Sequence, residues 1–130
     1  MRTRDKGRRG TAAVEFALAL PILALLILLV AEGSHAMHTY SALVEASREG
    51  ARHVLMQGDD ADVDALVSAL VADLDQDALS TDVVTDPVAN TVTVKVAYNY
   101  KPFGSSGEEG MLGDDNDDIQ FVAQTTMPLP

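Results

Sequence analysis

Residues 11–31 form an apolar run of 21 residues in which Glu15 is the one charged side chain. In a helix that rises about 1.5 Å per residue, such a run covers roughly 30 Å, the thickness of the hydrocarbon core of a membrane. The run therefore predicts a membrane-spanning helix. Roughly 90 residues are left to fold in water, which is enough for one small domain.

Charged residues are segregated along the chain. The first ten residues hold five Lys or Arg and one Asp, whereas the rest of the chain holds 4 basic and 19 acidic residues. Because basic residues favour the cytoplasmic side of a membrane, the N-terminus is expected inside and the acidic part outside. Nucleic acid is not an expected partner, since no basic cluster follows residue 10. Cysteine is absent, which excludes disulfides and thiolate metal sites but says nothing about the compartment.

The end of the apolar run leaves two alternatives to a processed anchor. Ser34-His35-Ala36 has the small-x-small pattern of a signal peptidase site, so cleavage after Ala36 could release a secreted binding domain. An uncleaved, signal-anchored envelope protein is the other alternative. Apolar and small residues nevertheless continue at helical spacing beyond Ala36, which predicts one helix from the membrane to about Met56; they are Tyr40, Leu43, Val44, Ser47, Ala51, Val54 and Leu55.

Glu15 and Pro21 are the two unusual residues of the run. A carboxylate at membrane depth costs a few kcal/mol unless it reaches the headgroups, is paired or is protonated. Glu15 could lie at the cytoplasmic interface. Alternatively, a cut after Gly10 would make Thr11 a new N-terminus one helical turn before Glu15, and its ammonium could neutralise the carboxylate. Pro21 is expected to kink the helix near Ala17, because proline removes a backbone donor.

The residues after the long helix predict a small α+β head. Asp59 or Asp60 is expected to cap a second helix, whose apolar stripe should pack on a sheet and comprises Val63, Leu66, Val67, Leu70, Val71 and Leu74. Residues 82–85 and 91–100 predict a hairpin around a turn at 86–90, and residues 119–127 a third strand after a loop at 101–118. The expected organisation is a basic leader (1–10), a span (11–31), an exterior continuation of the helix (32–57) and an acidic head (58–130).

Three groups of residues resemble ligand or contact sites, and each has a simpler interpretation. Asp114, Asn116 and Asp118 begin a calcium-loop pattern, but the glycine and glutamate that should complete it are Ile119 and Thr125, so a solvated acidic loop without a bound metal is expected. The group Glu32, His35 and His38 is expected to be a polar collar rather than a metal site. The group Tyr98, Tyr100 and Phe103 is either an exposed contact patch or, as we expect, a cover for the core.

Catalytic activity is not expected from this sequence. All three histidines, His35, His38 and His53, fall on the one predicted long helix. No pairing of a nucleophile with a base, and no carboxylate pair in a cleft, is recognisable. The chain is therefore not expected to be an enzyme.

The N-terminal motif resembles that of a known family. Residues 10–16 have the sequence GTAAVEF and are followed by ALALP at 17–21 and a leucine-rich stretch. This segment resembles the N-terminus of TadE-like pseudopilins of the tight-adherence (Flp-type) pilus system. Residues 46–52, 91–103 and 119–127 also resemble the end of the family's long helix, its valine-rich strand and its final strand. The charged ending of the family is replaced here by Pro128-Leu129-Pro130.

The resemblance implies a pilin-like fold and a role in pilus assembly. It implies that a prepilin peptidase cuts after Gly10, so that Thr11 becomes the first residue, Glu15 the fifth and Phe16 the sixth. The protein would then be a single-pass minor pseudopilin of a bacterial inner membrane, which either enters a surface pilus used in adhesion or primes its assembly. The implied partners are the prepilin peptidase, other pseudopilins and the major Flp-type pilin, the assembly platform, and membrane lipid.

Overall fold

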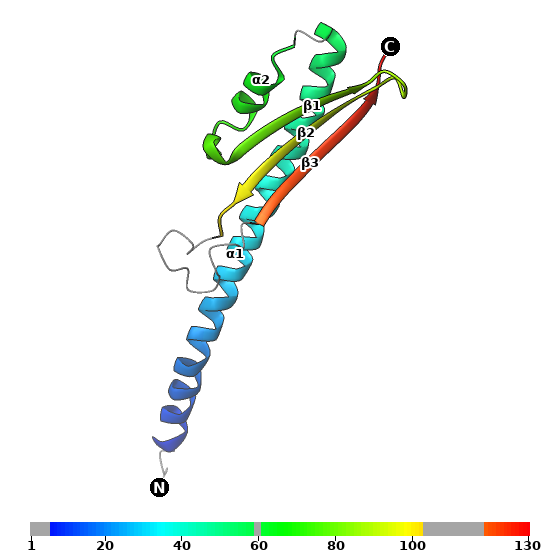
Figure 1. The fold of residues 1–130 in the computed structure, drawn as a ribbon. Coiled ribbons are helices and arrows are strands. Elements are labelled where there is room, and N and C mark those ends of the chain that lie inside the picture. The colour runs from blue at the N-terminus through cyan, green and yellow to red at the C-terminus, as the bar shows by residue number, and fades with distance from the viewer. Residues whose placement is uncertain (1–5, 59–60, 103–118) are drawn as a thin grey trace. The chain divides into compact units, whose positions relative to one another are not determined.

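A computed structural model describes residues 6–58, 61–102 and 119–130 of the chain. A long helix is followed by a short helix, a 3-10 turn and three strands (Figure 1). Their bounds are α1 Lys6–Gln57, α2 Val63–Leu70, the 3-10 turn Gln76–Ala78, β1 Leu79–Asp86, β2 Thr91–Tyr100 and β3 Ile119–Pro128. The α+β fold class expected from the sequence is confirmed.

The chain divides into two compact units, Met1–Ser34 and His35–Pro130. In the first unit, α1 carries the apolar run, and every residue from 10 to 31 is exposed. Phe16, Leu18, Ile22 and Leu29 expose 65%, 69%, 69% and 75% of their surfaces, respectively. Water disfavours an apolar surface that is bare on all sides of a helix, whereas lipid accommodates it. By length and composition, α1 is one helix that could cross a membrane.

The second unit, which we call the head, is built on one face of α1. The buried residues of this face recur every three or four positions and comprise Thr39, Leu43, Ala46, Ser47, Gly50, Ala51 and Val54. The helix expected to run to about Met56 is confirmed, because α1 ends at Gln57. On its head part Tyr40 is 43% exposed, whereas Thr39, Ala46 and Gly50 are buried. Small side chains on this face let the helix approach its neighbours closely, and a hydrophobicity pattern gives them too little weight.

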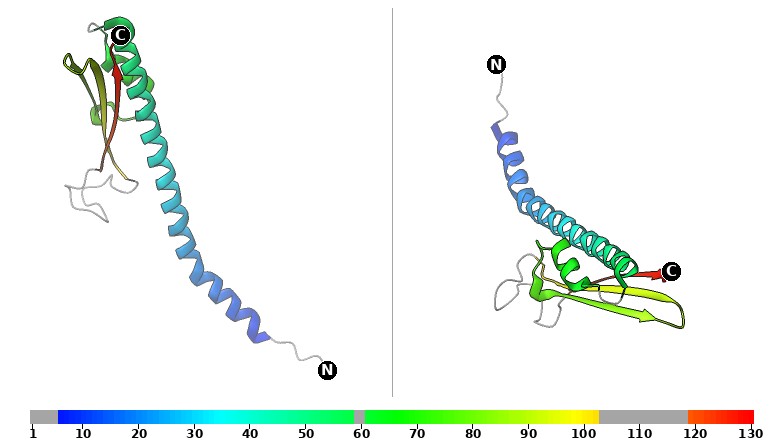
Figure 2. Two further views of the ribbon diagram at one scale, coloured as in Figure 1. Left: turned by 90° about the vertical axis from the view of Figure 1, so that its right-hand side faces the viewer. Right: turned by 90° about the horizontal axis from the view of Figure 1, so that it is seen from above.

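The sheet is antiparallel with the order β1-β2-β3, which confirms the expected hairpin and third strand. α2 and the head part of α1 lie on the same face of the sheet (Figures 1 and 2). The central strand supplies the core, since Val92, Val94 and Val96 are completely buried. β1 begins at Leu79, three residues earlier than expected, directly after the 3-10 turn that Asp75 caps.

The hairpin between β1 and β2 closes through side-chain and backbone bonds. Asp86 Oδ1 accepts from the amides of Val88 and Ala89 at 2.9 and 3.0 Å, and Asn90 takes a left-handed φ of 54°. Asn90 also holds the end of the chain, because its carbonyl accepts from the Leu129 amide at 2.8 Å and its side chain donates to the Leu129 carbonyl. The expected turn at 86–90 is therefore confirmed.

Helix α2 differs from its expected bounds at both ends. Its N-cap is Asp62, whose Oδ1 accepts from the Ala65 amide at 3.1 Å, so the expectation of a cap at Asp59 or Asp60, which lie outside the described residues, was wrong. The helix ends at Leu70, and Leu70 is 49% exposed rather than packed on the sheet. Val71 is completely buried, although it lies in the turn after the helix. The core-facing stripe thus continues in a turn, which periodicity cannot distinguish from a helix.

The close packing around Gly50 predicts that a larger side chain at this position destabilises the head. A Cβ at this position would lie 3.0 Å from Val63 Cγ1 and 3.2 Å from Val94 Cγ1, which leaves no room for a larger side chain. Gly50→Val should lower the free energy of unfolding of the head by about 1–3 kcal/mol through overpacking. Denaturant unfolding in detergent measures this value. Gly33→Val is the control, because a Cβ at Gly33 meets nothing within 4 Å; equal effects of the two variants would contradict the packing.

Replacing Thr39 is expected to change the stability of the head in the opposite direction to Gly50→Val. Its side chain is 1% exposed, and its hydroxyl has no hydrogen-bond partner among the described residues. Thr39→Val keeps the shape and removes the unsatisfied hydroxyl, so it should raise the free energy of unfolding by about 1 kcal/mol. Thr39→Ala also removes a methyl group and should not stabilise. A loss of stability in Thr39→Val would show that the hydroxyl is satisfied.

Candidate functional site

The candidate site is the start of the apolar run, and it lies within one continuous helix. α1 begins at Lys6, so Gly10, Thr11, Glu15 and Phe16 are all helical and lie on its first turns. All four are exposed in the first unit. Thr11 and Glu15 are four positions apart, which puts them on the same face of the helix. The segment is therefore presented to its surroundings and is not covered by the described part of its own unit.

Among the described residues, no contact explains the glycine at position 10. A Cβ built on Gly10 would meet nothing within 4 Å, and no left-handed φ requires a glycine there. The contrast is with Gly50, where Val63 and Val94 fill the space, and with Gly58, whose φ is 79°. A glycine inside a helix costs about 1 kcal/mol relative to alanine. Gly33 has equally open surroundings in the same helix, so packing among the described residues requires neither glycine.

Pro21 is accommodated without ending the helix. α1 continues on both sides of it, from Lys6 to Gln57. Proline has no amide hydrogen, so the carbonyl one turn earlier, at Ala17, receives no bond from it. The expected kink stays a prediction, and the weakened turn is where a bend would form.

The polar residues after the apolar run are not brought together as a metal site. Glu32 is half-buried and His38 is exposed, and the His35 ring lies 6.0 Å from the Tyr100 ring, at an angle of 42°. Among the described residues there is no group of three or more His, Cys, Asp or Glu placed to hold a metal ion. The weak calcium candidates Asp114, Asn116 and Asp118 lie outside the described residues.

The tyrosines at the end of β2 cover the core, as expected. Tyr100 is 4% exposed, and its ring stacks on the Phe121 ring at 4.9 Å. Tyr98 is half-buried against the core, and Phe103 lies outside the described residues. His35 and Tyr40 also join this group, which was not expected from the sequence. The sequence predicted that both residues lie on the long helix. It contained no signal that this helix packs beside Tyr100 and Phe121.

One known protein family matches part of the chain. The model of the family described as TadE-like protein matches residues 10–52. The match begins at Gly10 and covers the apolar run and most of the head part of α1, but not α2 or the sheet. No curated protein and no solved structure matches the chain.

Proposed function

We propose that this chain, a TadE-like protein of the tight-adherence pilus system by its match over residues 10–52, is a minor pseudopilin. TadE-like pilus proteins are structural components, and the chain would act by packing in the assembly or initiation of a type IV-like pilus. The observation that carries the proposal is the start of the family match at Gly10, directly before an apolar helix that is exposed on all sides. Such a helix suits both a membrane and a bundle of similar helices.

In this proposal a prepilin peptidase cuts between Gly10 and Thr11. The basic leader holds the N-terminus in the cytoplasm, and the head lies outside the inner membrane. The start of the family match at Gly10 supports its recognition by the peptidase, and the open space around Gly10 leaves it accessible. The small residues Thr11, Ala12 and Ala13 allow close approach of the peptidase and later of neighbouring helices. The expected partners are other pseudopilins, the major Flp-type pilin and the assembly platform.

The cut would also give Glu15 its partner. A new ammonium at Thr11 lies one helical turn from the Glu15 carboxylate, on the same face of the helix. The two charges neutralise each other within one subunit or between neighbours, which offsets the cost of a carboxylate in lipid. Before cleavage the same carboxylate has no ammonium at this position. Processing would therefore convert a poorly tolerated acid into an assembly contact, while Pro21 softens the helix as it packs.

Release of the head by signal peptidase after Ala36 is the alternative. The structure gives a reason against this cut, because Ala36 lies within α1, one residue after His35. Cleavage there would remove His35, whose ring lies 6.0 Å from Tyr100. It would also leave Thr39, which is buried in the core, near a frayed helix end. An uncleaved anchor keeps all these contacts and differs from the pseudopilin in the fate of residues 1–10 alone.

Mass spectrometry of the N-terminus from the native host separates these three functions. The pseudopilin should begin at Thr11, the secreted domain at Met37 and the anchor at the original N-terminus. Gly10→Leu should leave the precursor uncut, because a large side chain replaces the residue before the cleaved bond. Gly33→Leu is the matched control and should be cut normally, since Gly33 lies in open space beyond the run. Normal cutting of Gly10→Leu would falsify the role given to Gly10.

Glu15→Gln should separate processing from assembly. The variant keeps the size of the side chain, so cutting after Gly10 should continue, but the ammonium at Thr11 loses its partner. Loss of one partner of a desolvated ion pair costs about 3–5 kcal/mol, which for a pair between neighbouring subunits is roughly a hundredfold or more in association. Counting pili and capturing the major pilin with the tagged variant measure this loss. Glu45→Gln, at an exposed position of α1 in the head, is the control; pili at wild-type level with Glu15→Gln would contradict the pairing.

A further inference from the structure

Strand β1 lies at the edge of the sheet and has one open side. In the order β1-β2-β3, each of its residues pairs with β2, and among the described residues no strand pairs with its other side. Alternate residues of an edge strand direct their amide and carbonyl groups outward, where another strand can bind them. β1 therefore offers a row of backbone donors and acceptors.

The second half of β1 also leaves apolar side chains uncovered. Every residue from Asp82 to Asp86 is exposed, although the whole strand pairs with β2. Val83 lies opposite the buried Val94 on the core side of the sheet, and Val84 lies on the other face. These two valines expose 40% and 53% of their surfaces, respectively. Both faces of the strand thus present a valine that an added strand could cover.

The usual protection of an edge strand is missing from β1. Natural edges are commonly blunted by proline, by lysine, by a bulge or by a very short strand. Residues 79–86 contain no proline, glycine or lysine, and their one-to-one register with β2 has no bulge. β-Branched residues, which favour strands, make up half of β1; they are Thr81, Val83, Val84 and Thr85. Charge is what remains to select a partner for this edge.

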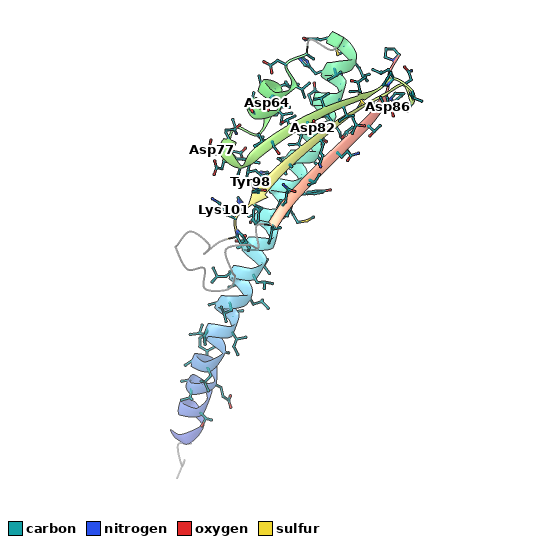
Figure 3. The ribbon with its side chains drawn as sticks, viewed as in Figure 1. Asp64, Asp77, Asp82, Asp86, Tyr98 and Lys101 are labelled. Carbon is teal, nitrogen blue, oxygen red and sulfur yellow. The ribbon has the colours of Figure 1, made fainter. Side chains whose placement is uncertain are left out.

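The charged side chains around this edge are acidic. From Ala61 to Val94 the sequence has seven aspartates and no lysine or arginine. Asp82 and Asp86 are both exposed and lie on the same face of β1, since they are four residues apart. Figure 3 shows Asp77, Asp82 and Asp86 in order along β1, from just before its start to its end. Such an edge attracts a basic segment and repels an acidic one.

A second copy of β1 is a poor occupant of this edge. When two copies pair antiparallel around Val83, Asp82 of one copy lies diagonal to Asp82 of the other. A shift of this centre to Asp82 places the two Asp82 carboxylates directly opposite each other. A shift to Val84 places Asp82 opposite Asp86. Like charges in these positions destabilise a strand pair.

The paired side of β1 shows which residues suit this strand. In β2, Lys95 lies opposite Asp82. Val94 and Thr93 lie opposite the next two residues of β1. A lysine followed or preceded by β-branched residues therefore matches this half of β1 in charge and in shape.

We propose that the open edge of β1 between Asp82 and Asp86 binds an extended segment of a basic partner protein. The segment adds to the sheet as a further strand, with Lys or Arg opposite Asp82 and Asp86 and β-branched residues between them. Backbone hydrogen bonds give affinity, the two charge pairs select the register, and the added side chains cover Val83 and Val84. The proposal goes beyond the pseudopilin function and does not require the cut after Gly10, because β1 lies wholly in the head.

Peptide binding to the full-length protein in detergent, measured by fluorescence anisotropy, tests this edge. The probe is the labelled peptide KVTVKV, which copies residues 91–96 with lysine in place of the first threonine, so that its lysines match Asp86 and Asp82. The acidic peptide EVTVEV is the control for charge. Two further forms of KVTVKV carry N-methyl groups on either the odd or the even residues, which removes the amide donors from one edge of the peptide at a time.

Strand addition predicts that KVTVKV binds several-fold more tightly than EVTVEV, and that one of its two methylated forms binds while the other does not. Asp82→Asn should weaken the binding of KVTVKV several-fold, because it removes a charge pair. Asp64→Asn is the matched control, since Asp64 is exposed on α2 and not on the edge. Equal unfolding midpoints of the two variants show that the head remains folded. Bound peptide should slow hydrogen exchange in residues 79–86 and not in β3, the other edge of the sheet.

Other results would overturn the proposal. No binding of KVTVKV, or no preference for it over EVTVEV, removes the basic partner. Equal binding of both methylated forms shows attraction by charge without strand pairing. Slowed exchange in residues 119–128 in place of 79–86 puts the peptide on the other edge, and protection of 79–86 that rises with protein concentration without peptide makes a second copy the occupant. Mass spectrometry measures processing separately, so failure of the pseudopilin function leaves each of these results interpretable.

Discussion

The rest of this structure depends on one helix, α1, whose two parts require different surroundings. Residues 10–31 of α1 are exposed on every side and are apolar apart from Glu15, so they need a medium that accepts apolar surface from all directions. Residues 39–54 bury one face, so they need a partner on one side and water on the other. The sheet and α2 supply that partner. The acidic residues that the structure describes beyond position 58 are all exposed, and charged side chains favour contact with water.

Close packing on the head part of α1 depends on small residues rather than on large apolar ones. Ala46, Ser47, Gly50 and Ala51 are buried together, and the space beside Gly50 is filled by valines of α2 and β2. Ser47 adds a polar contact to this face, because its hydroxyl lies 2.7 Å from the Thr125 hydroxyl and also donates to the Val44 carbonyl at 2.8 Å. These contacts connect α1 with β3, far apart in the chain. The head is thus held to the same helix that carries the candidate processing site.

Elements that rest on a long sequence pattern were predictable, whereas features that packing decides were not. The apolar run, the alternation of residues 91–100 and the turn at 86–90 predicted α1, β2 and the hairpin, since each rests on local periodicity or turn chemistry. The exposed side of Tyr40 and the end of α2 at Leu70 depend on which neighbours come close, and a periodic stripe cannot show that. Asp62 caps α2 although aspartates at 59 and 60 offered the same chemistry. Gly10 and Glu15 were recognisable as a motif, whereas the aromatic group around Tyr100 required the register of β2 and β3.

Cysteine accessibility along α1 tests the central claim that one helix crosses from lipid into a packed head. The chain has no cysteine, so single cysteines at positions 16–56 can be labelled in membrane vesicles with a membrane-impermeant maleimide, without background. Positions 16–30 should all stay unlabelled, whichever way they face. Labelling of positions 39–54 should rise and fall with a period of three to four residues. Cysteines at Leu43, Ser47 and Val54 should stay unlabelled, whereas those at Glu45, Arg48 and Arg52 should be labelled. Labelling throughout positions 16–30, or the same labelling on all faces of positions 39–54, would contradict the account.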